Sequence, residues 1–177
     1  MKKFFVLIAT GLVLMLSAPA TAHAGEGRLD GWGVGLGFGT GITGVSLKTL
    51  TGDAQALQLV IGCWGGYQNE CYGVGGSIDM LFKMPLITDE GAVRLAWNVG
   101  GGASMGVRSS TWRRHPHRDW RGRNMWLAGQ FVAGLEFLFP RVPLDVVLEW
   151  RPSIYVIPTF MHLDFENAGF HVRYYFQ

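Results

Sequence analysis

Apolar residues alternate with small or polar residues along most of this 177-residue chain. The stretch GWGVGLGFG at 31–39 places Trp32, Val34, Leu36 and Phe38 on one parity and glycine on the other. A period of two predicts a β-strand with two unlike faces. The same alternation predicts seven further strands, within 45–48, 57–63, 72–82, 93–100, 130–139, 144–154 and 169–176. We find no convincing amphipathic helix, so the predicted fold class is all-β with eight strands.

The stretch GTGITG at 39–44 matches the G-x-G-x-x-G pattern that holds a dinucleotide pyrophosphate. That pattern needs a helix opening inside it, within a βαβ unit. Here the following residues, VSLKTL, continue the period of two and begin no helix. We therefore set the dinucleotide interpretation aside. The glycines are expected to form the hairpin turn between the first two strands, where a positive φ is needed.

The chain begins with two lysines, an apolar run from Phe4 to Leu16 and an A-x-A site at 22–24. These features predict a secretory signal peptide over 1–24 and one mature domain over 25–177. Without Lys2 and Lys3, the 15 basic residues become 13, which equals the 13 acidic ones. A neutral mature chain argues against a nucleic-acid partner.

The composition of the two faces indicates which one points inward. The polar face consists mostly of Gly, Ala and Ser with a few charges, and glycine, with 26 residues, is about twice as frequent as average. Small residues suit the narrow interior of an eight-stranded barrel, and the aromatic-rich face suits lipid. We therefore predict an eight-stranded antiparallel up-and-down transmembrane β-barrel. A soluble, lipocalin-like periplasmic barrel with the faces reversed is the alternative.

Eight charged residues fall on the small-residue parity, four of each sign. They are Lys48, Asp79, Arg94, Glu136, Asp145, Glu149, Arg151 and Arg173. Charges inside a barrel must be paired and hydrogen-bonded. The sequence therefore predicts a closed, charge-paired lumen, with an ion or proton path through these pairs, and hence a narrow channel, as the alternative.

The loop RSSTWRRHPHRDWRGRN at 108–124 is the strongest local charge feature, with six arginines against Asp119. Its expected ligand-binding residues are Arg108, Trp112, Arg113, Arg114, Arg118, Trp120, Arg121 and Arg123. Arginine binds phosphate and sulfate in a bidentate manner, and tryptophan favours the membrane interface. We expect this outer loop to bind lipopolysaccharide phosphates or a sulfated host glycan; a merely solvated loop is the other interpretation.

The remaining candidate chemistry is sparse. Cys63 and Cys71 flank a short loop, and export favours a disulfide between them. We predict no metal site, because nothing completes the HPH pair at 115–117, and no cofactor. An enzyme is not expected; the rival hypothesis is a lipid-modifying barrel enzyme that uses Ser153, His162 and Glu149.

Three segments carry a resemblance to a known family: GVGLGFGTGITGVSLK, PLDVVLEWRPSIYVIP and the final GFHVRYYF. With them the chain resembles small OmpA/OmpX-type outer-membrane β-barrels, and more closely a family of predicted outer-membrane proteins of Gram-negative bacteria and spirochaetes. The resemblance implies an eight-stranded barrel in the outer membrane and names no catalytic residue. One departure is that Gln177 follows the aromatic Phe176, where such barrels typically end on the aromatic residue. We expect a monomer in contact with outer-membrane lipid and lipopolysaccharide.

Overall fold

The computed structural model describes residues 29, 31–39, 41–52, 54–64, 71, 73–88, 92–108, 125–139, 141–157 and 162–176. Its strands are β1 (Trp32–Gly39), β2 (Ile42–Gly52), β3 (Gln55–Trp64), β4 (Gly73–Lys83), β5 (Arg94–Arg108), β6 (Met125–Phe139), β7 (Leu144–Trp150), β8 (Ser153–Ile157), β9 (His162–Asp164) and β10 (Ala168–Phe176). Within these ranges, no helix is long and apolar enough to cross a membrane.

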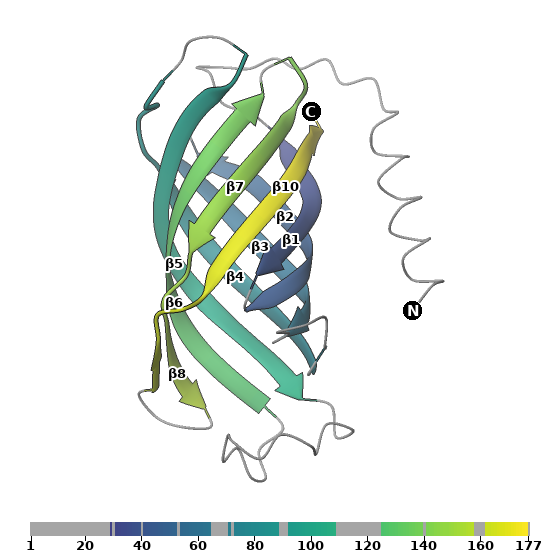
Figure 1. Cartoon of the computed structure of the whole chain (residues 1–177), viewed down its shortest axis with the longest axis vertical. Coiled ribbons are helices and arrows are strands. Elements are labelled where there is room, and N and C mark those ends of the chain that lie inside the picture. The colour runs from purple at the N-terminus through teal and green to yellow at the C-terminus, as the bar shows by residue number, and fades with distance from the viewer. Residues whose placement is uncertain are drawn as a thin grey trace, which may run out of the picture.

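The strands form one closed antiparallel barrel (Figure 1). Each strand from β1 to β6 pairs with the next, β6 pairs with β7, and β10 lies between β7 and β1. β7 and β8 are successive segments of one barrel strand, and β9 and β10 are successive segments of the last barrel strand. Because the ten segments make up eight barrel strands, the prediction of an all-β, eight-stranded antiparallel barrel is confirmed.

The predicted single strand over 144–154 is interrupted at 151–152, which separates β7 from β8. Pro152 explains the interruption, since it has no N–H to donate to a β-ladder. The wall stays continuous because Phe131 N–H donates to the carbonyl of Pro152 at 3.0 Å. The register of β6 is also the same on both sides, with Gly134 opposite Glu149 and Gln130 opposite Ser153.

The two ends of the barrel differ. At the termini end β1 begins and β10 ends, with Trp32 opposite Phe176, and at the loop end lie the β1–β2, β3–β4, β5–β6 and β8–β9 connections. In Figure 1 the termini end is uppermost. The 15-residue strands β5 and β6 are paired from Arg94 to Val107 and extend furthest toward the loop end. The expected loop over 158–166 contains the short strand β9, which pairs with β8.

Burial alternates along the strands as the sequence pattern predicts. In β4, Ser77 and Asp79 are buried in the lumen, whereas Val74, Ile78 and Phe82 are exposed on the outer face. The same alternation holds in β6 and β10. The prediction that the small and polar face points inward is therefore confirmed.

The GTGITG stretch forms the expected hairpin, but the expected reason for its glycines was wrong. Neither Gly39, Gly41 nor Gly44 has a positive φ; among the described glycines that conformation occurs at Gly31, with φ of 89°. Gly44 lies inside β2, where an added Cβ would collide with the backbone of Gly62 on β3. Close approach of two strands, rather than turn geometry, requires glycine there.

Candidate functional site

Glycines on the lumen face make room for large polar side chains on neighbouring strands. A Cβ added at Gly33 would stand 2.7 Å from the ring of Tyr175, and one added at Gly37 would stand 2.7 Å from His171 Nδ1. The small residues of the alternating pattern therefore set the space that the polar residues occupy. The lumen is filled by side chains, as expected of an eight-stranded barrel.

The first cluster of polar contacts surrounds Asp145 of β7, toward the termini end. Asp145 Oδ1 accepts a hydrogen bond from Arg173 Nε at 3.0 Å, and Oδ2 accepts one from the hydroxyl of Tyr175 at 2.8 Å. Lys48 Nζ lies 3.9 Å from Asp145 Oδ2 and also pairs with Glu136. Asp145 is fully buried, so these neighbours replace the water that the carboxylate loses on folding.

The second cluster surrounds Glu149 and lies nearer the loop end. Glu149 accepts hydrogen bonds from Gln58 Nε2 at 3.0 and 3.1 Å, and Arg151 Nη1 is 3.3 Å from its Oε2. Arg151 Nη2 reaches on to Asp79, which also accepts a hydrogen bond from Gln130. Arg151 therefore links the carboxylate of Asp79 on β4 to that of Glu149 on β7.

Gln58 joins the two clusters, because its amide nitrogen donates to Glu149 while its oxygen accepts from Arg173 Nη1. One continuous network therefore runs from Glu136 to Gln130. It is not completely satisfied: Arg173 Nη2 and Asn98 Oδ1 have no hydrogen-bond partner among the described residues. Because a buried ion pair is weak support for stability on its own, we expect such a network chiefly to favour one strand register.

His171 connects Glu149 to Ser46. Its Nε2 is 3.1 Å from Glu149 Oε2, and its Nδ1 is 3.1 Å from Ser46 Oγ. The order hydroxyl, imidazole, carboxylate is that of a hydrolase nucleophile with its base and acid. Ser46 is fully buried, however, so in this arrangement its hydroxyl is closed to a substrate. The contacts instead hold the imidazole in one orientation within the lumen.

Apolar clusters lie at both ends of the network. At the termini end, Leu29 packs with Ala96, Leu138 and Tyr175. Gly31, directly before β1, has the positive φ. At the loop end a second cluster is formed by Trp126, Ala128 and Tyr155, with Ile42 and Trp64 packed against it. The ring centroids of Trp64 and Trp126 are 5.2 Å apart, so aromatic side chains from β3 and β6 meet across the lumen.

The structure links seven of the eight predicted lumen charges to one another by the contacts above. Arg94, the eighth, is half-buried at the first position of β5, opposite Leu138. The predicted set omitted His171, Gln58, Gln130 and Tyr175, which carry much of the network. Their positions on the inward parity were the available signal, but only charged residues were selected from that parity.

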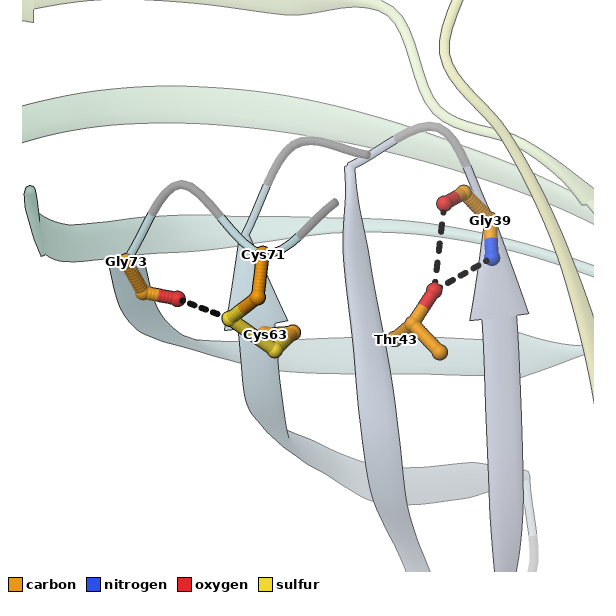
Figure 2. The surroundings of a disulfide bond; sticks show 5 residues. All are labelled: Gly39, Thr43, Cys63, Cys71 and Gly73. Atoms are coloured by element: carbon orange, nitrogen blue, oxygen red, sulfur yellow. Dashed lines mark hydrogen bonds between the residues drawn. A yellow bond between two sulfur atoms is a disulfide. The ribbon is translucent and has the colours of Figure 1, made fainter. Parts of the chain in front are cut away.

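A disulfide joins Cys63 to Cys71 at the loop end, with 5.3 Å between the two Cα atoms. Figure 2 shows it beside the β1–β2 turn, where the hydroxyl of Thr43 accepts from Gly39 N–H and donates to Gly39 C=O, both at 3.3 Å. Sγ of Cys71 lies 3.1 Å from the carbonyl oxygen of Gly73. The disulfide therefore connects β3 to Cys71, two residues before β4, near the point where the β3–β4 ladder ends.

The ligand-binding residues expected in the basic loop lie outside the described residues, apart from the backbone of Arg108 at the end of β5. The residues of the rival enzyme hypothesis are described, and the structure does not assemble them. Ser153 Oγ donates to the carbonyl of Arg151, and the ring of His162 lies 6.0 Å from that of Tyr155. Among the described residues, no group of three or more His, Cys, Asp or Glu side chains could hold a metal ion.

Comparisons of the chain with protein-family models, with curated proteins and with solved structures found no match.

Proposed function

We propose that this chain is a membrane-spanning barrel with a closed lumen that anchors surface-exposed loops in the bacterial outer membrane. The observation that carries the proposal is the inverted distribution of its residues. Asp79, Asp145 and Arg173 are fully buried inside, while Trp32 is 60% exposed and Val74 59% exposed on the outer face. A water-soluble barrel would expose its charges and bury its large apolar residues.

Aromatic residues near both ends of the outer face support this assignment. Trp32, the first residue of β1, is opposite Phe176, the last residue of β10, at the termini end. Toward the loop end, the rings of Phe38 and Phe170 lie 6.4 Å apart. Aromatic residues are enriched at the two water interfaces of membrane barrels. Most strands have 8 to 15 residues, which is compatible with the about 9 to 11 needed to cross a bilayer.

The packed lumen favours an anchor over the alternative of a narrow channel. The ion pairs occupy the middle of the lumen, and apolar clusters lie at its two ends. Side chains of the described residues thus fill the middle and both ends of the lumen, which favours a closed lumen over an aqueous path. The barrel's contribution to function is then the presentation of the loops at the loop end.

The most strongly charged loop is the basic segment between β5 and β6. These two strands are the longest in the barrel, so the hairpin that carries the loop extends furthest from the barrel at the loop end. Its arginines and tryptophans suit an anionic glycolipid, above all lipopolysaccharide, or a sulfated host ligand.

Cell fractionation with a heat-modifiability gel tests the membrane assignment. The chain should be recovered in the outer membrane of a Gram-negative host and should migrate differently before and after boiling. Recovery as a soluble periplasmic protein would overturn the assignment and favour the lipocalin-like alternative.

The loop is tested separately, by replacing its six arginines with serine. We expect the variant to fold and fractionate normally while losing binding to lipopolysaccharide and heparin. Unchanged binding would remove the ligand proposal and leave the anchor in place.

A further inference from the structure

The outer face of the barrel continues further toward the loop end on one side than on the other. β1 ends at Gly39, opposite Gly169 of β10, whereas β5 and β6 remain paired as far as Val107 and Met125. β8 pairs with β6 in this part, and Figure 1 shows β5, β6 and β8 reaching beyond the end of β1. We call the outer face of these three strands at the loop end the loop-end extension. Its large outward residues are Met105, Val107, Met125, Leu127, Ile154 and Val156.

The loop-end extension continues the apolar outer face without a charged position. On β5 and β6, no charged residue occupies an outward position between Leu95 and Val107 or between Met125 and Phe139. Met105 and Val107 are about half exposed, as Ile78 is in the middle of β4. The extension and the middle of the outer face therefore have the same apolar character.

Charge begins where the extension ends. Arg108 follows Val107 directly in the sequence, and the other arginines of the basic loop lie between it and Met125. Arginine keeps its charged head group in a polar layer while its stem lies along an apolar surface. This order along the chain fits an apolar layer bordered by anionic head groups.

The apolar outer surface is much taller on β6 than on β2. At about 3.4 Å per residue and a tilt of about 40°, the 15-residue β6 spans roughly 35 Å along the barrel axis. The usual apolar band of a membrane barrel is about 25 Å tall. On β2, the apolar outward residues are Val45 and Leu47, and threonines occupy the outward positions 43, 49 and 51. A membrane of even thickness therefore does not match both sides.

Polar groups at the border of the extension are satisfied within the chain. The indole N–H of Trp150, on the outer face, donates to the carbonyl of Phe165 at 2.8 Å. In the same irregular segment between β9 and β10, the carbonyl of Asn167 accepts from Arg151 N–H at 2.8 Å. Irregular backbone beside hydrocarbon needs such internal partners, because acyl chains offer no hydrogen bonds. The extension ends at this segment, since Glu166 is exposed and charged.

We propose that lipid acyl chains cover the loop-end extension, so that the membrane surrounds the barrel to unequal heights and is thinner beside the β1–β2 turn. The proposal rests on the membrane assignment above and names the part of the loop end that lies in the membrane. A bilayer accommodates such a mismatch by changing its thickness locally or by a tilt of the protein. A protein partner fits less well, since protein interfaces form about one hydrogen bond per 100–200 Å² and the six outward side chains contain no nitrogen or oxygen.

The test uses nitroxide spin labels on the refolded barrel in phosphatidylcholine vesicles. Single cysteines are introduced by Val107→Cys and Met125→Cys in the extension, and by Ile78→Cys in the middle of the outer face. Gly41→Cys, in the β1–β2 turn, is the matched position on the opposite side, because an added Cβ there meets nothing within 4 Å. The native disulfide stays oxidised, and the wild-type chain treated in the same way gives the background.

Collisions of each label with oxygen, which dissolves in acyl chains, are compared with collisions with a neutral nickel complex, which stays in water. We expect the labels at Val107 and Met125 to favour oxygen as strongly as the label at Ile78. The label at Gly41 should collide with nickel at least about tenfold more often, because polar solutes are excluded from hydrocarbon.

Three results would overturn the proposal. The first is equal access of nickel to Val107, Met125 and Gly41 while Ile78 favours oxygen, which would place the extension in water. The second is exclusion of both reagents from Val107 and Met125, which would indicate a protein cover such as a second copy. The third is the same oxygen preference at Gly41 as at Met125, which would give a membrane of even height. Access of nickel to Ile78 as well would overturn the membrane assignment and this proposal with it, so the two failures are distinguishable.

Discussion

The inner and outer faces of the barrel wall meet their surroundings in opposite ways. Inside, each charge of the network is held by neighbours fixed on other strands, as Arg173 of β10 is by Asp145 of β7 and Gln58 of β3. Outside, large apolar side chains such as Ile78 and Leu148 are about half exposed. The difference indicates that the inner face depends on specific partners, whereas the outer face presents apolar side chains to whatever surrounds the barrel. Substitutions on the two faces should therefore differ both in the physical cause and in the size of their effect on the free energy of unfolding.

The largest expected effect is that of breaking the inner network at its centre. Arg173→Met leaves Asp145 without its closest guanidinium and Gln58 Oε1 without its donor. Removing one partner of a buried ion pair typically costs about 3–5 kcal/mol. Reversible urea unfolding in micelles, followed by tryptophan fluorescence, measures the loss. Val172→Ala, the outward neighbour, should cost less than about 1 kcal/mol; equal losses would contradict the comparison of the two faces.

The next prediction tests whether lipid or water surrounds the outer face. Ile78 is 51% exposed in the middle of β4, and Ile87 is 57% exposed in the β4–β5 connection. In a lipid bilayer, Ile78→Lys should cost about 2–4 kcal/mol, because a lysine near the midplane loses its hydration, whereas Ile87→Lys should cost about 0–1 kcal/mol. Unfolding from lipid vesicles measures both. Equal, small losses would indicate that water surrounds the outer face.

A single hydrogen bond of the inner face is expected to have a smaller effect. Tyr175→Phe removes the hydroxyl that donates to Asp145 Oδ2 at 2.8 Å and keeps the ring in place. Because the acceptor is a buried carboxylate, we expect a loss of about 1.5–3 kcal/mol. A double-mutant cycle with Asp145→Asn isolates the pair, and a coupling energy near zero would show that the hydroxyl contributes nothing specific to the network.

The sequence sufficed for the wall of the barrel but not for the contacts inside it. A period of two assigns each residue to a face, because side chains alternate along a strand. Partners such as Lys48 and Glu136, 88 positions apart, depend on how the strands are registered, which the alternation leaves open. Leu29 lies before the first periodic segment, so nothing in the pattern assigned it to the lumen. Pro152 did carry a readable signal for the β7–β8 interruption, since proline seldom lies inside a strand.

The smallest expected effect tests whether glycine is needed only on the inner face. At Gly33 an added Cβ would stand 2.7 Å from the ring of Tyr175, whereas at Gly129, on the outer face of β6, it would meet nothing within 4 Å. Gly33→Ala should therefore cost about 1–3 kcal/mol, as overpacking of a filled interior does. Gly129→Ala should instead stabilise the barrel by about 0.4–1 kcal/mol, because it restricts only the unfolded chain. Urea midpoints of the two variants measure the difference. If both midpoints moved in the same direction, the space inside the lumen would not be what selects glycine at Gly33, and the contrast between the faces would rest on charge alone.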